Sequence, residues 1–405
     1  METLTSGLDY YKPTMSQLAY RQEPDAQVTY SLHNRGKQHF ADYIKPEQLR
    51  ERFDDIQARG WTPQETQFLG SIVINGDQSA FSSGYQDYLL THPLPPVEVR
   101  YDQSSEDLTA TTTGDWPTAM FWETQVMADV SENYFENYLL AHAISRTTIY
   151  NEGDRRLSEK IAVLQAHPDI RIADFGTRRR FSLSWHEHVL ERLVTECPNS
   201  LAGTSNVAFA QKYNLKPIGT FAHEMPMVYA ALADIRGQDV RSSHHQFLED
   251  WYGLYGEEYS IALTDTFGTD FFFDDFTPDQ ARKWRGVRQD SGDPFTFGEQ
   301  LIRFYEDLGI DPKSKVLVFS DNLNFRKIVE LKEQFGNRIN DLDGIGTNLT
   351  NDLGLDALNM VMKATKVKAA EGEQSTVKLS DDKGKHTGPP DLVSLYENRY
   401  FRKAA

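Results

Sequence analysis

With 405 residues, 39% of them hydrophobic, the chain is neither disordered nor small enough for one core. We therefore expect two domains, or one large α/β unit with an appended domain. Lys and Arg number 42 against 60 Asp and Glu, and the formal charge of -18 argues against nucleic acid and anionic membrane as partners, so an anionic ligand needs a local basic pocket.

The N-terminal region, up to residue 150, is predicted to form an α+β domain. A helix is expected near Met15–Tyr20, and a long helical stretch runs from Ala119 to about Ile144. Strands are predicted over Gln27–Leu32, Val97–Tyr101 and Leu108–Thr113.

From residue 151 to about residue 355 the pattern alternates between amphipathic helices and short strands. Ser184 with Glu187 forms a capping-box pattern at the start of one of these helices. Apolar residues at helical spacing mark two others, at Leu157, Ile161 and Leu164 and at Phe297, Leu301, Phe304 and Leu308.

Seven strands can be proposed in this region, and each ends in small, hydroxyl or charged residues. The ends are Asp174–Thr177, Gly203–Asn206, Gly219–Thr220 with His223, Thr264–Thr266, Arg288–Asp293, Ser320–Asn322 and Gly344–Thr347. In parallel βα folds the C-terminal ends of the strands meet on the ligand-binding face, so these polar residues should gather there. We favour a parallel barrel, with an open doubly wound sheet as the alternative.

After residue 355 the alternation stops. Asn359–Lys368 and Ser375–Leu379 are predicted to be two strands joined by a polar turn around Gly372. We expect the segment 356–405 to leave the barrel and pack on the N-terminal domain.

Two patterns offer binding groups for an anion. Arg178–Arg180 presents guanidinium groups whose planar fork matches carboxylate or phosphate, although any one of the three is as readily a surface ion pair. Gly344-Ile345-Gly346-Thr347 offers backbone N–H groups that can close around a phosphate. Alone, the second pattern is more typical of a tight turn.

The run Arg288–Asp293 combines a guanidinium with two carboxylates ahead of an amphipathic helix. Arg288 suits a phosphate, and Asp290 suits a ribose hydroxyl, Mg²⁺ or positive charge on an anomeric carbon. Asp293 is better explained as the cap of the helix that begins at Pro294.

His223 is the histidine best placed for chemistry, because it follows the third predicted strand. It is a candidate proton shuttle or nucleophile toward phosphate, and a metal site is disfavoured because no second histidine lies at metal-ligand spacing nearby. The pairs His186 with His188 and His244 with His245 lie in helical, polar stretches, and we expect them to face solvent.

Six motifs occur in a defined order: Asp174-Phe175-Gly176-Thr177-Arg178-Arg179-Arg180-Phe181-Ser182, Gly203-Thr204-Ser205-Asn206, Gly219-Thr220 with Ala222-His223-Glu224, Asp290-Ser291-Gly292-Asp293-Pro294, Val318-Phe319-Ser320-Asp321-Asn322 and Gly344-Ile345-Gly346-Thr347. Together they resemble the signatures of nicotinate phosphoribosyltransferases. The resemblance extends from Asp9-Tyr10-Tyr11-Lys12 to Lys378-Leu379-Ser380-Asp381, nearly the whole chain. It implies a type II phosphoribosyltransferase fold, an irregular seven-stranded α/β barrel with an N-terminal α+β domain, usually a homodimer with shared active sites.

The resemblance also implies how the base binds. Phe175, and Tyr11 from the partner subunit, would enclose the pyridine ring of nicotinate, and Arg178 would face its carboxylate. Thr204 and Ser205 would belong to the same substrate-binding set. The neutral hydroxyl of Ser205 favours the acid over nicotinamide, because nicotinamide phosphoribosyltransferase has an aspartate at this position.

For the sugar and phosphates, the resemblance implies a second set of roles. His223 would be transiently phosphorylated by ATP. Asp290, assisted by Asp265, would hold the ribose and its oxocarbenium-like transition state, and Arg288 would bind phosphate. Gly344, Gly346 and Thr347, with Ser320, would hold the 5′-phosphate. Mg²⁺ would enter with the pyrophosphate, and Asp290 is its one candidate protein ligand.

The expected reaction combines nicotinate, phosphoribosyl pyrophosphate (PRPP), ATP and water into nicotinate mononucleotide, pyrophosphate, ADP and phosphate, a step of NAD salvage. Transfer onto nicotinamide is the nearest alternative. A catalytically silent barrel that binds nucleotides or a partner protein, and an aldolase-type barrel, which would need a Schiff-base lysine at a strand end, are the others. The single cysteine, Cys197, and the lack of an apolar leader predict a reducing, cytoplasmic location.

Overall fold

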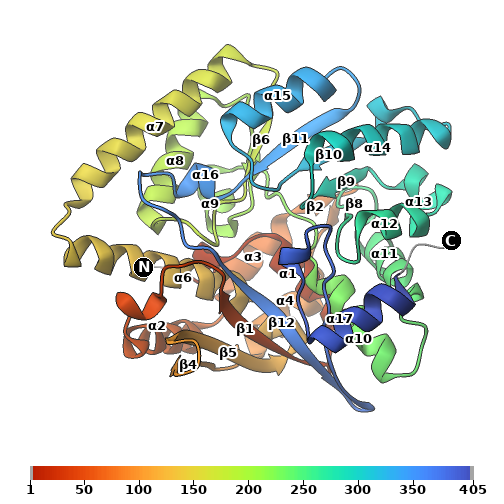
Figure 1. The fold of residues 1–405 in the computed structure, drawn as a ribbon, viewed down its shortest axis with the longest axis horizontal. Coiled ribbons are helices and arrows are strands. Elements are labelled where there is room, and N and C mark those ends of the chain that lie inside the picture. Colours follow the sequence, from red (N-terminus) through yellow and green to blue (C-terminus); the bar gives the residue numbers. More distant parts are fainter. Residues whose placement is uncertain (1–2, 402–405) are drawn as a thin grey trace.

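Two β-sheets organise the chain in the computed structural model, which describes residues 3–401. One sheet has five antiparallel strands and the other has six parallel strands, while β2 (Val73–Ile74) and β3 (Gln78–Ser79) form a small separate ribbon. Figure 1 shows the antiparallel sheet at the bottom of the molecule and the parallel sheet, with its helices, above it. The α/β fold class with an N-terminal α+β domain is therefore confirmed.

The antiparallel sheet joins the beginning of the chain to its end. Its strands, in the order β13-β12-β1-β5-β4, are β1 (Gln27–Asn34), β4 (Val97–Asp102), β5 (Asp107–Asp115), β12 (Met360–Ala369) and β13 (Gly372–Ser375). Alternating burial along β1 places Val28, Tyr30 and Leu32 in the core. Because β12 pairs with β1 from Met360 to Lys368, the C-terminal segment completes this sheet.

The second predicted C-terminal strand begins earlier than expected, at Gly372, and ends at Ser375. The residues that follow turn toward the parallel sheet instead, because Leu379 donates its backbone N–H to the carbonyl of Thr266. Lys378 forms one antiparallel bridge with Thr387. This departure from strand geometry brings Lys378 to the ends of the parallel strands.

The helices of the N-terminal half accompany the antiparallel sheet. They are α1 (Tyr11–Gln22), α2 (Pro46–Arg59), α3 (Pro63–Ser71), α4 (Ser83–Thr91), α5 (Trp116–Ala119) and α6 (Trp122–Ala141). Of these, α2, α5 and α6 pack on the strands of the sheet. The chain at α1 is bonded directly to the second part of the molecule. The backbone N–H of Tyr10 donates to Ser205, and the hydroxyl of Thr14 donates to the carbonyl of Thr220.

The parallel sheet has the order β7-β6-β11-β10-β9-β8. Its strands are β6 (Ile172–Asp174), β7 (Leu201–Thr204), β8 (Ile261–Leu263), β9 (Gly286–Gln289), β10 (Val316–Phe319) and β11 (Asn340–Ile345). They are six of the seven strands that the sequence predicted.

The seventh predicted strand, before Gly219, is reduced to one parallel bridge between Pro217 and Thr204. Proline has no N–H to donate, so the segment cannot continue a hydrogen-bonded ladder. It nevertheless contacts both edges of the sheet. Ile218 donates its N–H to Thr204 in β7, and the hydroxyl of Thr220 donates to Ile261 in β8.

Eleven further α-helices follow in the described chain, of which α7, α8, α14 and α15 lie along the outer side of the parallel sheet in Figure 1, while α10 contacts β12 and β13. The set is α7 (Arg146–Ala166), α8 (Leu183–Glu196), α9 (Val207–Tyr213), α10 (Glu224–Ile235), α11 (Ser242–Tyr255), α12 (Thr269–Asp275), α13 (Pro278–Lys283), α14 (Pro294–Asp307), α15 (Phe325–Phe335), α16 (Thr347–Thr350) and α17 (Pro390–Leu395). The domain boundary predicted at residue 150 falls inside α7. Between residues 3 and 401, no helix combines the length and the apolar character that a membrane span requires.

Two helix caps test the local predictions. Asp293 accepts the N–H of Thr296 at the start of α14, so the capping role predicted for Asp293 is confirmed. The predicted box of Ser184 with Glu187 is wrong, because Ser182 caps α8. Glu187 lies too far along α8 to bond back to Ser182, and its carboxylate forms an ion pair with Lys212 of α9 instead.

A separate apolar cluster holds the C-terminal segment against the parallel half of the molecule. Phe267 and Phe271 pack there against Val377, Tyr396 and Phe401. The rings of Phe267 and Phe401 are stacked, with centroids 3.9 Å apart. This packing holds the segment that contains Lys378 against the ends of the strands.

Candidate active site

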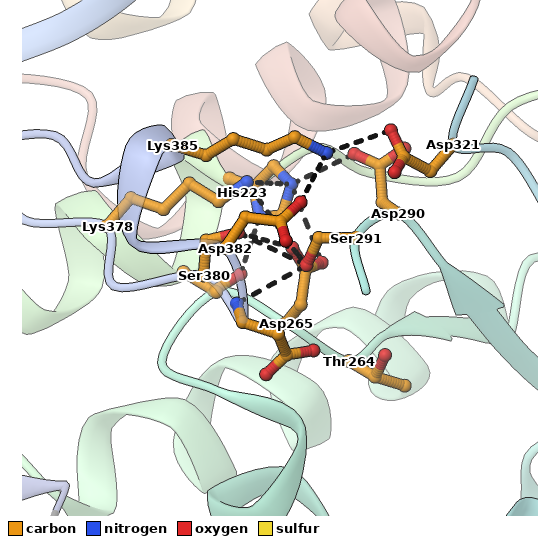
Figure 2. A network of polar contacts seen from close by, with 12 residues as sticks. His223, Thr264, Asp265, Asp290, Ser291, Asp321, Lys378, Ser380, Asp382 and Lys385 are labelled. Atoms are coloured by element: carbon orange, nitrogen blue, oxygen red, sulfur yellow. Dashed lines mark hydrogen bonds and ion pairs between the residues drawn. The ribbon is translucent and has the colours of Figure 1, made fainter. Parts of the chain in front are cut away.

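His223, Asp265 and Asp290 meet at the C-terminal ends of the parallel strands (Figure 2). His223 directly precedes α10, Asp265 follows β8 and Asp290 follows β9. The Nε2 atom of His223 lies 3.1 Å from Asp290 Oδ2 and 3.7 Å from Asp265 Oδ1, while its Nδ1 lies 3.0 Å from the hydroxyl of Thr266. Both carboxylates therefore lie near the same ring nitrogen, Nε2.

Lys378 completes this cluster, and the sequence patterns assigned it no role. Its Nζ lies 2.9 Å from Nε2 of His223 and 3.4 Å from Asp265 Oδ2. Figure 2 shows Lys385 beside it, reaching Asp321 at 2.9 Å. The sequence signal that points to Lys378 is its place in the Lys378-Leu379-Ser380-Asp381 motif. Because Val377 and Leu379 beside it are apolar, the pattern over residues 375–379 instead predicts a strand.

Burial and neighbouring charges set the protonation states of the side chains in this cluster. Burial and the charge of Lys378 lower the pKa of His223 to about 4, so the imidazole is neutral at neutral pH and keeps one unprotonated nitrogen. Burial alone would raise the pKa of Asp290, but the hydrogen bond with His223 and the charge of Arg288 hold it well below its usual value. Asp290 is therefore a carboxylate at neutral pH.

The same cluster contains the donor atoms that a divalent cation prefers. One atom from each of His223, Asp265 and Asp290 lies within 4.8 Å of the others. Asp290 is the better candidate for Mg²⁺, because its side chain is 32% exposed. Asp265 is fully buried and is already bonded to Ser291 and to Lys378.

Arg288 and Ser320 lie on either side of Asp290. The guanidinium of Arg288 donates to the carbonyl of Phe221 at 3.0 Å, and its Nε has no partner within residues 3–401. The hydroxyl of Ser320 lies 2.8 Å from Asp290 Oδ1 and 2.9 Å from the carbonyl oxygen of Gln289, so its one proton is shared between these two acceptors. Ser320 therefore orients the carboxylate, and Arg288 retains a donor for a ligand.

The predicted base-binding residues lie at the ends of β6 and β11. The ring of Phe175 lies over Gly344, where an added Cβ would stand 2.3 Å from the ring. Arg178 Nε lies 3.1 Å from Asp9, and its guanidinium carbon lies 5.6 Å from the centre of the Tyr11 ring. Tyr11 reaches Arg178 within one chain. The expectation that Tyr11 of the partner subunit covers the base stays a prediction.

Thr204 and Ser205, predicted to bind substrate, are both buried behind the base-binding residues. The hydroxyl of Thr204 donates to Asp174 at 2.6 Å, and that of Ser205 donates to Asp9 at 2.6 Å. Each therefore contacts a carboxylate that lies next to a base-binding residue. Gly346 and Thr347 are partly exposed at the end of β11, where α16 begins.

A buried ion-pair network connects the base-binding residues with the helix that follows His223. Lys12 is fully buried and lies 2.6 Å from both Glu123 and Glu224. Glu224 is the first residue of α10, and it also accepts the indole N–H of Trp116 at 2.8 Å. Glu123 lies 3.8 Å from Arg178. These buried charges are paired, which avoids the large cost of an isolated buried charge.

A basic cavity of about 580 Å³ is formed beside the antiparallel sheet. Its lining includes Arg35, Lys363, Lys366, His33 and His386, and none of its described lining residues is acidic. Burial, with the nearby charges of Lys378 and Arg178, lowers the pKa of Lys363 to about 8. This is the kind of local basic pocket that the overall negative charge demands of an anion-binding protein.

The prediction that His186 and His244 face solvent is wrong. His186 is fully buried and its Nε2 lies 2.7 Å from Asp174, while His244 is buried with its Nδ1 2.7 Å from Asp275. Each imidazole fits inside the protein because an aspartate pairs with it. The neighbours His188 and His245 are only partly exposed.

Comparison with known proteins gives one consistent result. The profile described as the nicotinate phosphoribosyltransferase (NAPRTase) family matches residues 170–402, and that of the family's N-terminal domain matches residues 7–131. A nicotinate phosphoribosyltransferase from Desulforapulum autotrophicum is 37% identical over 395 residues, which is 95% of each chain. One from Ralstonia nicotianae is 37% identical over 382 residues, 92% of each chain.

Solved structures agree with the sequence comparisons. The crystal structure of nicotinate phosphoribosyltransferase from Porphyromonas gingivalis has a TM-score of 0.87 at 31% identity and covers 98% of this chain and 99% of its own. That from Vibrio cholerae has a TM-score of 0.88 at 29% identity, covering 100% of this chain and 95% of its own.

Proposed function

Because the chain belongs to the nicotinate phosphoribosyltransferase family, we propose that it transfers the phosphoribosyl group of PRPP to nicotinate and couples this step of NAD salvage to ATP hydrolysis through His223. The observation that carries the proposal is the partly buried contact of His223 with Asp290, 3.1 Å apart, beside the ammonium group of Lys378. It combines a nucleophilic nitrogen, an ionised carboxylate and a fixed positive charge.

The base binds between aromatic rings in this proposal. Phe175 offers its ring face to the pyridine, Tyr11 lies on the side of Arg178, and the guanidinium of Arg178 pairs with the carboxylate of nicotinate. All three side chains come from one chain. A homodimer with shared active sites remains part of the proposal, in which Tyr11 of the partner subunit also lies over the base.

The sugar reacts next to Asp290. Its carboxylate stabilises the positive charge that develops on the anomeric carbon as the bond to pyrophosphate breaks and the bond to the pyridine nitrogen forms. Arg288, Lys363 and Arg35 supply positive charge for the phosphate groups. Mg²⁺ bound with PRPP supplies further charge to the leaving pyrophosphate, and Asp290 is the residue that would contact it.

ATP is consumed at His223. The unprotonated nitrogen attacks the γ-phosphorus, a nitrogen–phosphorus bond forms, and the bond to ADP breaks. Lys378 neutralises part of the charge that the phosphoryl group brings to the cluster. Water later cleaves the nitrogen–phosphorus bond and releases phosphate, which restores the free imidazole.

Nicotinamide is the alternative base. The full charge of Arg178 favours the carboxylate of nicotinate over an uncharged amide. The hydroxyl of Ser205 points in the same direction, because it is neutral and is already bonded to Asp9, the ion-pair partner of Arg178. An aspartate at position 205 would add negative charge where the acid has to bind.

The test is a set of parallel assays with PRPP, Mg²⁺ and either base, each with and without ATP. We expect nucleotide product from nicotinate, stimulated by ATP in the wild type. His223→Ala should lose the stimulation, and His188→Ala, a partly exposed histidine on α8, should keep it. Full ATP stimulation in His223→Ala would refute the phosphohistidine, and product from nicotinamide alone would favour the alternative base.

A further inference from the structure

We propose that His186 is a positioning residue, which acts through Asp174 to hold the turn that presents Phe175 and Arg178 to the aromatic base. The identity of the base rests on the proposed function. The positioning itself rests on the hydrogen bonds around Asp174, which are independent of the reaction.

Asp174 is the point from which this turn begins. It is the last residue of β6, and it is fully buried. Its carboxylate accepts three hydrogen bonds, from His186 Nε2 at 2.7 Å, from the Thr204 hydroxyl at 2.6 Å and from the backbone N–H of Gly176 at 2.9 Å. One side chain therefore connects β6, β7 and α8 to the first residues of the turn.

His186 acts in this site as a fixed donor. Its ring is fully buried, and its edge packs on Phe209 with centroids 4.9 Å apart. Its Nδ1 has no partner in the described part of the chain. A proton on that nitrogen would be buried without an acceptor, so the stable form carries its proton on Nε2 and donates it to Asp174.

The turn after Asp174 leaves little room for adjustment. Phe175 donates its N–H to Ile345 at the end of β11, and the carbonyl of Gly176 accepts the hydroxyl of Thr350. A Cβ on Gly176 would stand 2.1 Å from Thr350, so the turn is packed directly against α16. A rotation of the Asp174 carboxylate would break its bond to Gly176 and move Phe175 and Arg178 together.

His186 touches none of the residues proposed to contact the base, so its effect should fall on binding of the base. Losing one donor to a buried carboxylate should raise the KM for nicotinate about tenfold. The KM for PRPP should change less than about twofold, because His223, Asp290 and Lys378 come from other strands and segments. His186→Leu is the variant that removes the donor.

Three further variants complete the test. His186→Gln retains an N–H donor at a similar reach and should restore most of the affinity. Thr204→Val removes a second donor to the same carboxylate at nearly constant side-chain shape. This variant replaces His186→Leu in the test if His186→Leu does not fold. The matched control is His188→Gln, on the same helix and also paired with an aspartate, Asp154, but partly exposed.

The measurements are KM and kcat for both substrates, and hydrogen–deuterium exchange of residues 175–182 in the substrate-free protein. Faster exchange confined to this turn in His186→Leu or Thr204→Val, with His186→Gln and His188→Gln resembling the wild type, supports the proposal. Exchange that rises over the whole chain, or equal KM values in His186→Leu and His188→Gln, overturns it. A wild type that does not turn over nicotinate refutes the proposed function, and the exchange data still decide the positioning.

Discussion

Nζ of Lys378 lies 2.9 Å from Nε2 of His223, although 155 residues separate the two in the chain. Lys378 belongs to the segment that follows the antiparallel sheet, and His223 directly precedes the first helix residue of α10. The contact therefore depends on both halves of the molecule.

Lys378→Met should weaken ATP-dependent turnover about tenfold, because a phosphoryl group on His223 would lose its nearest positive charge. It should also raise the pKa of His223 above about 4, since the charge of Lys378 helps to lower it. NMR titration of the His223 imidazole measures the second effect. Lys212→Met, which removes an exposed lysine of α9, should change neither, and an unaltered His223 titration in Lys378→Met would contradict the assignment.

Affinity for PRPP should fall as the pH rises through about 8, where Lys363 loses its proton. Phosphate binds the charged lysine, so binding is favoured below this pKa and weakens above it, by up to about tenfold per pH unit. Calorimetric titration from about pH 7 to about pH 9 measures the change. Lys363→Met should lose this pH dependence, whereas Lys366→Met, which removes a half-exposed lysine paired with Glu373, should keep it.

Asp343→Asn should stabilise the fold at neutral pH. Both carboxylate oxygens of Asp343 are buried without a partner within residues 3–401, and burial raises the pKa of Asp343 well above its usual value. The unfolded chain ionises this group above about pH 4, so its penalty on stability appears there and grows with pH until the folded protein also ionises. The variant should gain about 1 kcal/mol or more in the free energy of unfolding at neutral pH, and none below about pH 4. Denaturant unfolding at both pH values measures this gain. An equal gain in the free energy of unfolding at both pH values would contradict the explanation.

Gly344→Ala should raise the KM for nicotinate, because the added methyl group would stand 2.3 Å from the Phe175 ring and displace it. Steady-state kinetics with both substrates measure the effect, and the KM for PRPP should rise as well if Gly344 also holds the 5′-phosphate. Gly253→Ala is the control, because a Cβ at that position on α11 meets no atom within 4 Å. Equal kinetics in the two variants would show that Phe175 does not hold the base.

The sequence was most informative where a reactive side chain directly follows a predicted strand. His223 and Asp290 were singled out from the residues after predicted strands, and Asp265 was added through the family resemblance. The structure brings the three together because parallel strands end on one face. Six of the predicted strands are present. The seventh was misjudged because an apolar run with Pro217 resembles a strand in composition but lacks the donor that a ladder needs.

Hydrogen bonds between residues far apart in the chain could not be predicted from local sequence patterns. His186 lies on a helix among polar neighbours, and only the folded chain shows that Asp174 faces it. Ser205 was placed with the substrate-binding residues, and only the folded chain shows that its hydroxyl donates to Asp9 of the N-terminal region. Lys378 was missed for the same reason. Its role depends on a change of direction after Ser375 that no local pattern encodes.

The pairing of β12 with β1 has a consequence for how the protein is made. While the ribosome is still synthesising the parallel strands, one edge of β1 has no partner, since β12, its neighbour on that side, follows all of these strands in the chain. Such late, long-range pairing slows folding and leaves an exposed edge to which other chains can bind. Activity should therefore appear only after Lys378 has emerged and has reached His223, which completes the pocket.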